Sequence, residues 1–266
     1  MAVPSDTDHS AKADPDSLPF VAPCRQVGAA APLRWLRLGW RDLRRAPRQS
    51  LSYGAFFVAV SYLVSLLAWE LGSPLVLLGM LSGFVFLGPV LAIGLYSISY
   101  QLQRGLAPRI GYCVREGKRH LGNEMIFAFI LVIVFLVWAR AASMVHVFFP
   151  VEAHPRPMEL VVFFGVGSAV GSIFAAIVFA AAAFSLPMIM DRKVDMVTAV
   201  VTSINAVLRN KGTMVVWAGL IVVSVAVGFV TAFLGLAVLL PVIGHATWHA
   251  YQETIDAGAW PRHEED

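Results

Sequence analysis

Two histidines near the end of the last apolar stretch are the residues of this chain best suited to chemistry. His245 and His249 are four positions apart, so a helix would place them on one face. Two imidazoles on one face can ligate a metal ion, and a histidine can also ligate haem iron. However, no Glu completes an HExxH motif, and Trp248 and Tyr251 beside them are typical of an aromatic belt at a membrane surface. We therefore expect His245 and His249 to anchor a helix end, with no metal and no cofactor bound; metal or haem ligation is the alternative.

Asp191 and Arg192 form a matching polar end to the fourth apolar stretch. A cation is favoured at a helix C-terminus, which accounts for Arg192. For Asp191 we predict a pairing with His245 or His249 across a helix bundle.

Glu70 and Arg140 are ionisable residues within or at the end of apolar stretches. Such residues are costly in a bilayer and often functional. We expect a structural ion pair between them. The alternatives are that each side chain reaches the membrane surface, or that the two line a substrate path.

Three prolines, Pro89, Pro187 and Pro241, lie in apolar surroundings where helices are expected. Proline removes a backbone hydrogen bond, so each one predicts a kink. Broken helices also form substrate sites in some transporters, which is the alternative interpretation.

The composition indicates the setting in which these residues work. Apolar residues make up 58% of the 266 residues, charged residues only 14%, and the mean hydropathy is +0.71. Soluble domains carry roughly 25% charged residues, so the chain has too little polar surface for a soluble enzyme. We predict an all-α polytopic membrane protein with no enzymatic activity. Six stretches are long enough to span a bilayer: 51–72, 75–100, 125–149, 159–189, 213–232 and 234–251.

The basic residues predict the orientation of these spans. Eight Lys and Arg precede residue 51, five lie between spans two and three, four between spans four and five, and one follows span six. The remaining two are Arg140 and Arg156. This asymmetry places both termini in the cytoplasm and predicts contact with anionic lipid headgroups rather than nucleic acid. Residues 1–30 are expected to be a disordered acidic tail, 31–256 a membrane domain, and 257–266 a cytoplasmic tail.

The membrane domain shows signs of a threefold repeat, with units at 33–104, 109–190 and 193–256. Each unit begins with a basic amphipathic segment, followed by a hairpin of two spans, and such segments lie in the headgroup plane. The apolar stripe of the first consists of Leu33, Leu36, Trp40 and Leu43. That of the second follows Ile110, Cys113 or Val114, Gly117 and Leu121, and that of the third Val194, Val197, Val201, Ile204 and Leu208.

Three motifs close the three units: residues 88–96 (GPVLAIGLY), 186–192 (LPMIMDR) and 240–251 (LPVIGHATWHAY). On these motifs, residues 30–256 resemble the bacterial integral membrane proteins grouped as domain of unknown function 2189. The resemblance implies a multi-pass protein of the bacterial inner membrane with about six spans. It implies no activity, although it places Asp191, Arg192, His245 and His249 in the motifs.

Three functions remain open at this point. We expect a non-enzymatic scaffold or assembly partner that contacts lipid or another membrane protein. The alternatives are a small-solute transporter or channel, lined by Glu70, Arg140 and the prolines, and a haem- or metal-binding accessory of a respiratory complex.

Overall fold

The computed structural model describes residues 19–70, 88, 92–148 and 156–263. All regular elements among these residues are helices, which confirms the predicted all-helical class. They are α1 (Ala31–Arg45), α2 (Pro47–Glu70), α4 (Ile93–Gln103), α5 (Ile110–Phe148), α6 (Pro157–Ala182), α7 (Ser185–Asp191), α8 (Met196–Arg209), α9 (Lys211–Val230) and α10 (Leu236–Thr254).

Four segments of the described chain are long and apolar enough to cross a membrane: Pro47–Leu67, Met125–Val145, Pro157–Asp191 and Lys211–Val230. They correspond to the expected first, third, fourth and fifth spans. The expected span 75–100 lies largely outside the described residues. The expected span 234–251 forms α10, which is helical but is not among these four.

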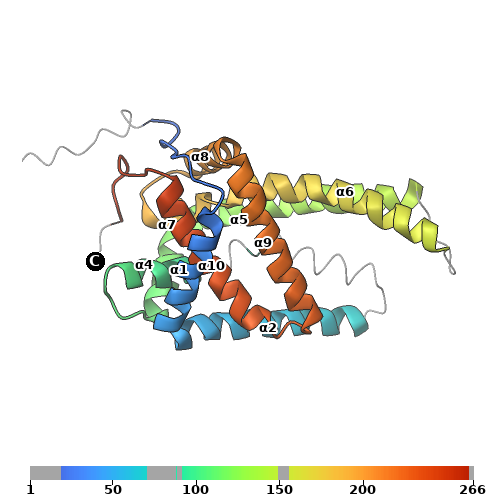
Figure 1. The fold of residues 1–266 in the computed structure, drawn as a ribbon, viewed down its shortest axis with the longest axis horizontal. Coiled ribbons are helices and arrows are strands. Elements are labelled where there is room, and N and C mark those ends of the chain that lie inside the picture. The colour runs from blue at the N-terminus through green and yellow to red at the C-terminus, as the bar shows by residue number, and fades with distance from the viewer. Residues whose placement is uncertain (1–18, 71–87, 89–91, 149–155, 264–266) are drawn as a thin grey trace, which may run out of the picture.

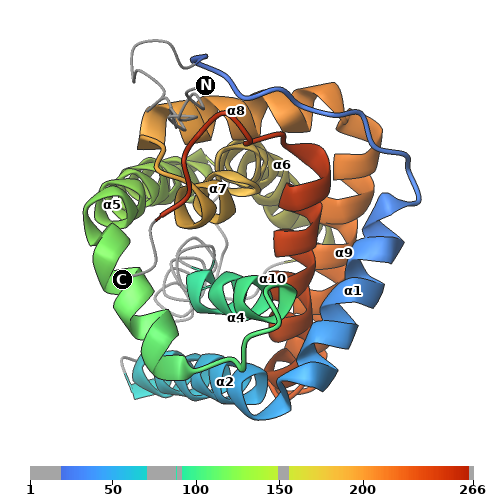
Figure 2. The same ribbon diagram turned by 90° about the vertical axis from the view of Figure 1, so that its left-hand side faces the viewer.

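The helices form a packed end and an extended end. Helices α5 and α6 run side by side away from the packed end, and α2 runs along the opposite edge (Figure 1). Seen from the packed end, α4 and α7 lie inside the outline formed by the other helices (Figure 2). Helix α10 contacts α1, α2, α4, α7 and α9, so it is the central element.

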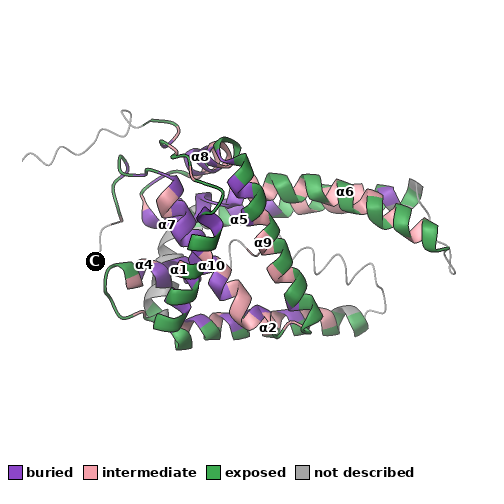
Figure 3. Cartoon of the chain, in the orientation of Figure 1, coloured by how far each residue is buried: buried purple, intermediate pink, exposed green. Residues whose placement is uncertain are grey.

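Burial follows the same division. Buried residues concentrate where α1, α4, α7 and α10 meet, whereas most of the described side chains of α5 and α6 are exposed or half-buried (Figure 3). The core at the packed end includes Trp35, Phe184, Trp217, Trp248 and Tyr251. The exposed side chains of α5 and α6 are large and apolar, among them Phe129, Val161, Phe164 and Ile173. An exposed apolar surface of this kind suits contact with lipid.

Helix α10 is approached closely by two helices at glycines. A Cβ on Gly39 of α1 would lie 2.5 Å from the carbonyl oxygen of Val242, and a Cβ on Gly54 of α2 would clash with the carbonyl of Ala237. Pro241 lies inside α10 and has no N–H to give to that same carbonyl of Ala237. Pro241 therefore lies inside the helix and leaves the Ala237 carbonyl without a helical donor. This carbonyl faces Gly54.

The helix predicted over 159–189 is interrupted just before Pro187. Helix α6 ends at Ala182 and α7 begins at Ser185. The hydroxyl of Ser203 on α8 accepts a hydrogen bond from the Phe184 N–H (3.1 Å) and donates one to the Ala180 carbonyl (2.7 Å). Ser203 thus satisfies backbone groups that the break leaves without helical partners. Pro89 lies outside the described residues.

Only two of the three expected interfacial helices are separate elements. Helices α1 and α8 are distinct, and each is joined to the following helix through a single residue, Ala46 or Asn210. The second segment is continuous with the expected third span in the 39-residue helix α5, so the prediction of a separate interfacial helix there is wrong. The sequence from Ile110 to Phe148 contains no proline, and its glycines are too few to end a helix. The threefold repeat stays a prediction.

In α1 and α8 the predicted apolar stripe is only partly on the outside, because Leu43 of α1 and Val194, just before α8, are buried. Leu33 and Trp40 of α1, and Val197 and Leu208 of α8, are exposed. The buried faces combine large apolar residues, such as Trp35 of α1, with smaller or polar ones, such as Gly39 and Asp42 in α1 and Ala199 and Thr202 in α8. Each helix therefore has one face against the protein and a second apolar face that is free for headgroups.

Part of the expected N-terminal tail is ordered. The backbone N–H of Arg25 donates to the Thr254 carbonyl (2.8 Å), that of Val27 to the side chain of Asn210 (2.9 Å), and that of Ala22 to the hydroxyl of Thr202 (3.0 Å). The prediction of disorder up to residue 30 is therefore wrong for this stretch, because side chains of α8 and the end of α10 supply its backbone with partners.

Candidate functional site

The structure brings His245 and His249 together with an acidic residue that the sequence analysis did not single out. His249 Nε2 lies 2.7 Å from Asp42 Oδ2, and the Ser99 hydroxyl donates to the same oxygen at 2.9 Å. His245 Nδ1 lies 2.8 Å from Ser99 Oγ, and His245 Nε2 lies 2.9 Å from Ser50 Oγ. We call these five residues (Asp42, Ser50, Ser99, His245 and His249) the Asp42 network.

Four helices contribute to the Asp42 network. Both histidines project from one face of α10, as their spacing predicts, while Asp42 lies on the buried face of α1. Ser50 lies in the first turn of α2, and Ser99 lies on α4. All five side chains are buried, and His245, Ser50 and Ser99 are 0% exposed. The network therefore ties α1, α2 and α4 to the central helix.

The hydrogen bonds of the network define where its protons lie. Ser99 has a single hydroxyl hydrogen and gives it to Asp42, so Ser99 Oγ must accept from His245 Nδ1–H. In a neutral imidazole the other nitrogen is an acceptor, so His245 Nε2 accepts from the Ser50 hydroxyl. His249 donates its Nε2 hydrogen to Asp42. These contacts are consistent with one arrangement of protons, in which His245 carries its hydrogen on Nδ1.

The carboxyl of Asp42 is held in its charged form. Burial alone would raise the pKa of Asp42, but hydrogen bonds from His249 and Ser99 and the nearby histidines outweigh burial and lower the pKa below its usual value. A buried carboxylate with two donors on one oxygen is an anchor for the groups around it.

Asp191 has other partners than the predicted histidines. Its Oδ2 accepts hydrogen bonds from Tyr251 (2.9 Å) and Gln252 (3.4 Å) of α10, and from Arg192 (3.0 Å). The prediction that Asp191 pairs with His245 or His249 is therefore wrong. The reason is geometric: Asp191 contacts the last turns of α10, whereas the histidines contact α1, α2 and α4.

Glu70 and Arg140 are not brought together. Both are exposed, Glu70 at the last residue of α2 and Arg140 on α5. These helices run along opposite edges of the molecule (Figure 1). Among the described residues no ion pair joins the two, so the predicted pair is absent there.

The histidines do not offer a free metal site in this arrangement. Both nitrogens of His245 contact serine hydroxyls, and His249 Nε2 contacts Asp42. No group of three or more His, Cys, Asp or Glu side chains placed to hold a metal ion occurs among the described residues. An ion or haem iron would have to displace hydrogen bonds that the protein already makes.

Asp42, Ser50 and Ser99 were missed because a single position carries little signal. Asp42 is the only acidic residue in the arginine-rich stretch 31–50. The only local indication was that this single carboxylate lies on the face opposite the apolar stripe. A buried charge needs a partner, but the sequence does not show which residue it is.

Comparison with known proteins places the chain in the membrane. Residues 76–191 match the family described as "Predicted integral membrane protein (DUF2189)". This match confirms the resemblance drawn from the motifs. It covers the first motif and the second as far as Asp191; the third motif, with both histidines, follows the matched residues. No curated protein and no solved structure matches the chain. The protein is thus an integral membrane protein with several apolar helices.

Proposed function

We propose that this integral membrane protein is a non-enzymatic scaffold, a rigid helical platform that contacts a partner membrane protein at a bilayer surface. The observation that carries the proposal is the Asp42 network. The polar side chains best suited to catalysis or ligation are directed into the protein, where they hold helices together.

The network and a second set of contacts attach α1 firmly to α10. Near its start, α1 is held by Glu253, which accepts from Trp35 Nε1 at 3.0 Å and forms an ion pair with Arg34. Near its end, α1 is held by the contact between Asp42 and His249. Two polar attachments and the close approach at Gly39 leave α1 little freedom to move relative to α10.

The outer face of α1 supplies the surface for contact. Its exposed residues include four arginines and two large apolar side chains: Leu33, Arg37, Trp40, Arg41, Arg44 and Arg45. A helix with this composition binds anionic headgroups and lies in the membrane surface. This proposal includes contact with anionic lipid and location in the bacterial inner membrane. It also includes a cytoplasmic position for both termini.

Two other functions find less support. A transporter path along Glu70 and Arg140 would have to join two exposed residues of α2 and α5, helices that run along opposite edges of the molecule (Figure 1). A haem or metal accessory would use histidines that already make hydrogen bonds through both nitrogens of His245 and through Nε2 of His249. The scaffold requires neither that Glu70 and Arg140 meet nor that the histidines give up their hydrogen bonds.

The proposal is tested on complexes in native membranes. The triple variant Arg41→Glu, Arg44→Glu, Arg45→Glu reverses the charge of the outer face without touching the network. We expect the wild type to run as a high-mass species on native gels, and the triple variant to lose this species while it stays folded and inserted. Arg156→Glu, which changes an exposed arginine before α6, serves as the control. Ion or solute flux through the wild-type protein in sealed vesicles, with no high-mass species, would contradict the scaffold and favour the transporter.

A further inference from the structure

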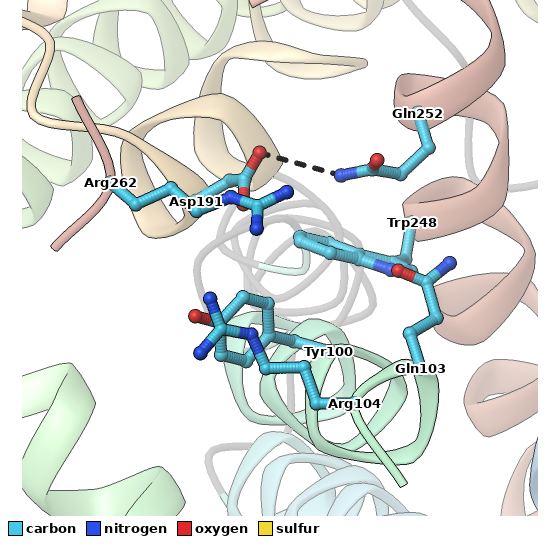
Figure 4. A pocket seen from close by; sticks show the side chains of 7 residues that line it. All are labelled: Tyr100, Gln103, Arg104, Asp191, Trp248, Gln252 and Arg262. Atoms are coloured by element: carbon cyan, nitrogen blue, oxygen red, sulfur yellow. Dashed lines mark hydrogen bonds between the residues drawn. The ribbon is translucent and has the colours of Figure 1, made fainter. Parts of the chain in front are cut away.

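A polar cavity lies where the last turns of the three motif-bearing helices meet. Its volume is about 220 Å³. Helix α4 and its end contribute Tyr100, Gln103 and Arg104, α7 contributes Asp191, and α10 contributes Trp248 and Gln252, while Arg262 comes from the segment after α10 (Figure 4). We propose that this cavity binds a small oxyanion, the phosphate group of a soluble compound or of a lipid headgroup, between Arg104 and Arg262.

The charges at the cavity favour an anion. Arg104 and Arg262 point toward the same space as the tip of the Trp248 ring (Figure 4). Among the described residues that line the cavity the only carboxylate is Asp191, which already accepts from Arg192, Tyr251 and Gln252. The positive charges of Arg104, Arg192 and Arg262 exceed the negative charge nearby. That negative charge is the Asp191 carboxylate and about half a unit at the C-terminus of each of the three helices.

The two arginines of the lining are held in place. The guanidinium of Arg104 lies 4.7 Å from the centre of the Tyr100 ring, and Tyr100 packs edge-on against Trp248 at 5.8 Å. Arg262 is positioned through its backbone, because Lys193 N–H donates to the Pro261 carbonyl (2.9 Å) and Arg192 Nη1 donates to the Trp260 carbonyl (2.9 Å). Because the two arginines are already held in place, less conformational entropy is lost when a ligand binds.

Trp248 also lines the cavity, with the tip of its ring toward the two arginines. Trp248 is 0% exposed, and its indole Nε1 has no hydrogen-bond partner in the part of the chain that the structure describes. That nitrogen has almost no accessible surface, so Trp248 contributes the face and tip of its ring to the cavity wall rather than a donor. One water occupies roughly 30 Å³ of liquid, so the cavity has room for a phosphate group with a small substituent.

The site is separate from the Asp42 network, and it does not depend on the scaffold proposal. A scaffold and a transporter could both carry it. Failure of the scaffold test would therefore leave this inference standing, and failure of the binding test would leave the scaffold standing.

The test is a titration of the purified full chain in uncharged detergent at low salt. The probes are inorganic phosphate, dihexanoyl phosphatidylglycerol and, for comparison, dihexanoyl phosphatidylcholine. Binding is followed by Trp fluorescence and by the rise in Tm that a ligand of the folded state produces. The variants are Arg262→Gln and Arg104→Gln, with Arg45→Gln on the outer face of α1 as the matched control.

We expect the wild type and Arg45→Gln to bind alike, and Arg262→Gln and Arg104→Gln to bind about tenfold more weakly or worse, because each loses a charge-assisted hydrogen bond. Binding of phosphate itself supports a soluble ligand, and binding of phosphatidylglycerol alone supports a lipid headgroup. Absence of binding, equal binding by all variants, or equal affinity for phosphatidylcholine and phosphatidylglycerol would overturn the proposal. Gel filtration and circular dichroism check that each variant is folded; if one is not, the other decides.

Discussion

Asp42 and His249 lie in contact through a 2.7 Å hydrogen bond although 207 positions separate them in the chain. Asp42 belongs to the first helix of the described chain and His249 to the last. Their contact joins the two ends of the helical assembly. It also gives His249, which by sequence resembles a metal ligand, the role of a structural hydrogen-bond donor.

Replacing Asp42 by Asn tests the strength of this closure. The variant keeps the shape of the side chain but removes the charge that His249 and Ser99 share, so we expect the free energy of unfolding to fall by about 1–3 kcal/mol. Unfolding in detergent, followed by circular dichroism, measures the change. Asp256→Asn, which alters an exposed pair with Arg25, is the control and should have little effect. Equal losses in the two variants would argue against the network.

The pH dependence of stability should follow Asp42. Although burial opposes it, the hydrogen bonds from His249 and Ser99 lower the pKa of Asp42 in the folded state. Its contribution is therefore present above the unfolded pKa of about 3.9 and is lost as the pH falls through the lower, folded pKa. Tm measured from about pH 6 down to about pH 3 should fall more steeply in the wild type than in Asp42→Asn. Parallel curves would show that Asp42 does not titrate with folding.

Gly54→Ala tests the close approach of α2 to α10. The added Cβ meets the backbone carbonyl of Ala237, which cannot move aside as a side chain can, so we expect a loss of about 1–3 kcal/mol or more. In the middle of α9, Gly219 faces open space, and Gly219→Ala should leave Tm unchanged or raise it slightly. If Gly54→Ala were as stable as Gly219→Ala, the two helices would not be in contact at this point.

Ser203→Ala tests the bridge across the break between α6 and α7. The variant leaves the Phe184 N–H and the Ala180 carbonyl without their partner, so a loss of about 1–3 kcal/mol is expected. Ser224→Ala removes a hydroxyl that bonds only a carbonyl of its own helix, and it should change stability much less. Thermal unfolding of the two variants side by side gives the comparison, and a similar result for both would contradict the bridge.

The purified protein should show no haem band in its visible spectrum and less than stoichiometric metal. The reason is that the nitrogens of His245 and the Nε2 of His249 already have partners within 2.9 Å. A Soret band or stoichiometric metal that disappears in His245→Ala, His249→Ala would contradict this expectation and favour the accessory function.

Local pattern was enough to predict several elements. The first amphipathic segment is α1, the third is α8, and four of the apolar stretches correspond to segments able to cross a membrane. Helical period and composition act over short distances, so they can be read from neighbouring residues. The same reasoning placed His245 and His249 on one face and predicted a kink at Pro187, close to the break that the structure shows between α6 and α7.

What each side chain touches was decided by tertiary structure. The sequence by itself determined a helical membrane protein, polar helix ends and the residue types at those ends. Only the packing of α10 against α1, α2 and α4 decided that the histidines meet Asp42, that Asp191 meets Tyr251, and that Glu70 and Arg140 stay apart. A buried polar residue needs one partner of suitable chemistry, and several residues of the chain qualify for each position. Which of them comes within 3 Å depends on how distant helices cross, and this is set by contacts such as those at Gly39 and Gly54 rather than by any local pattern.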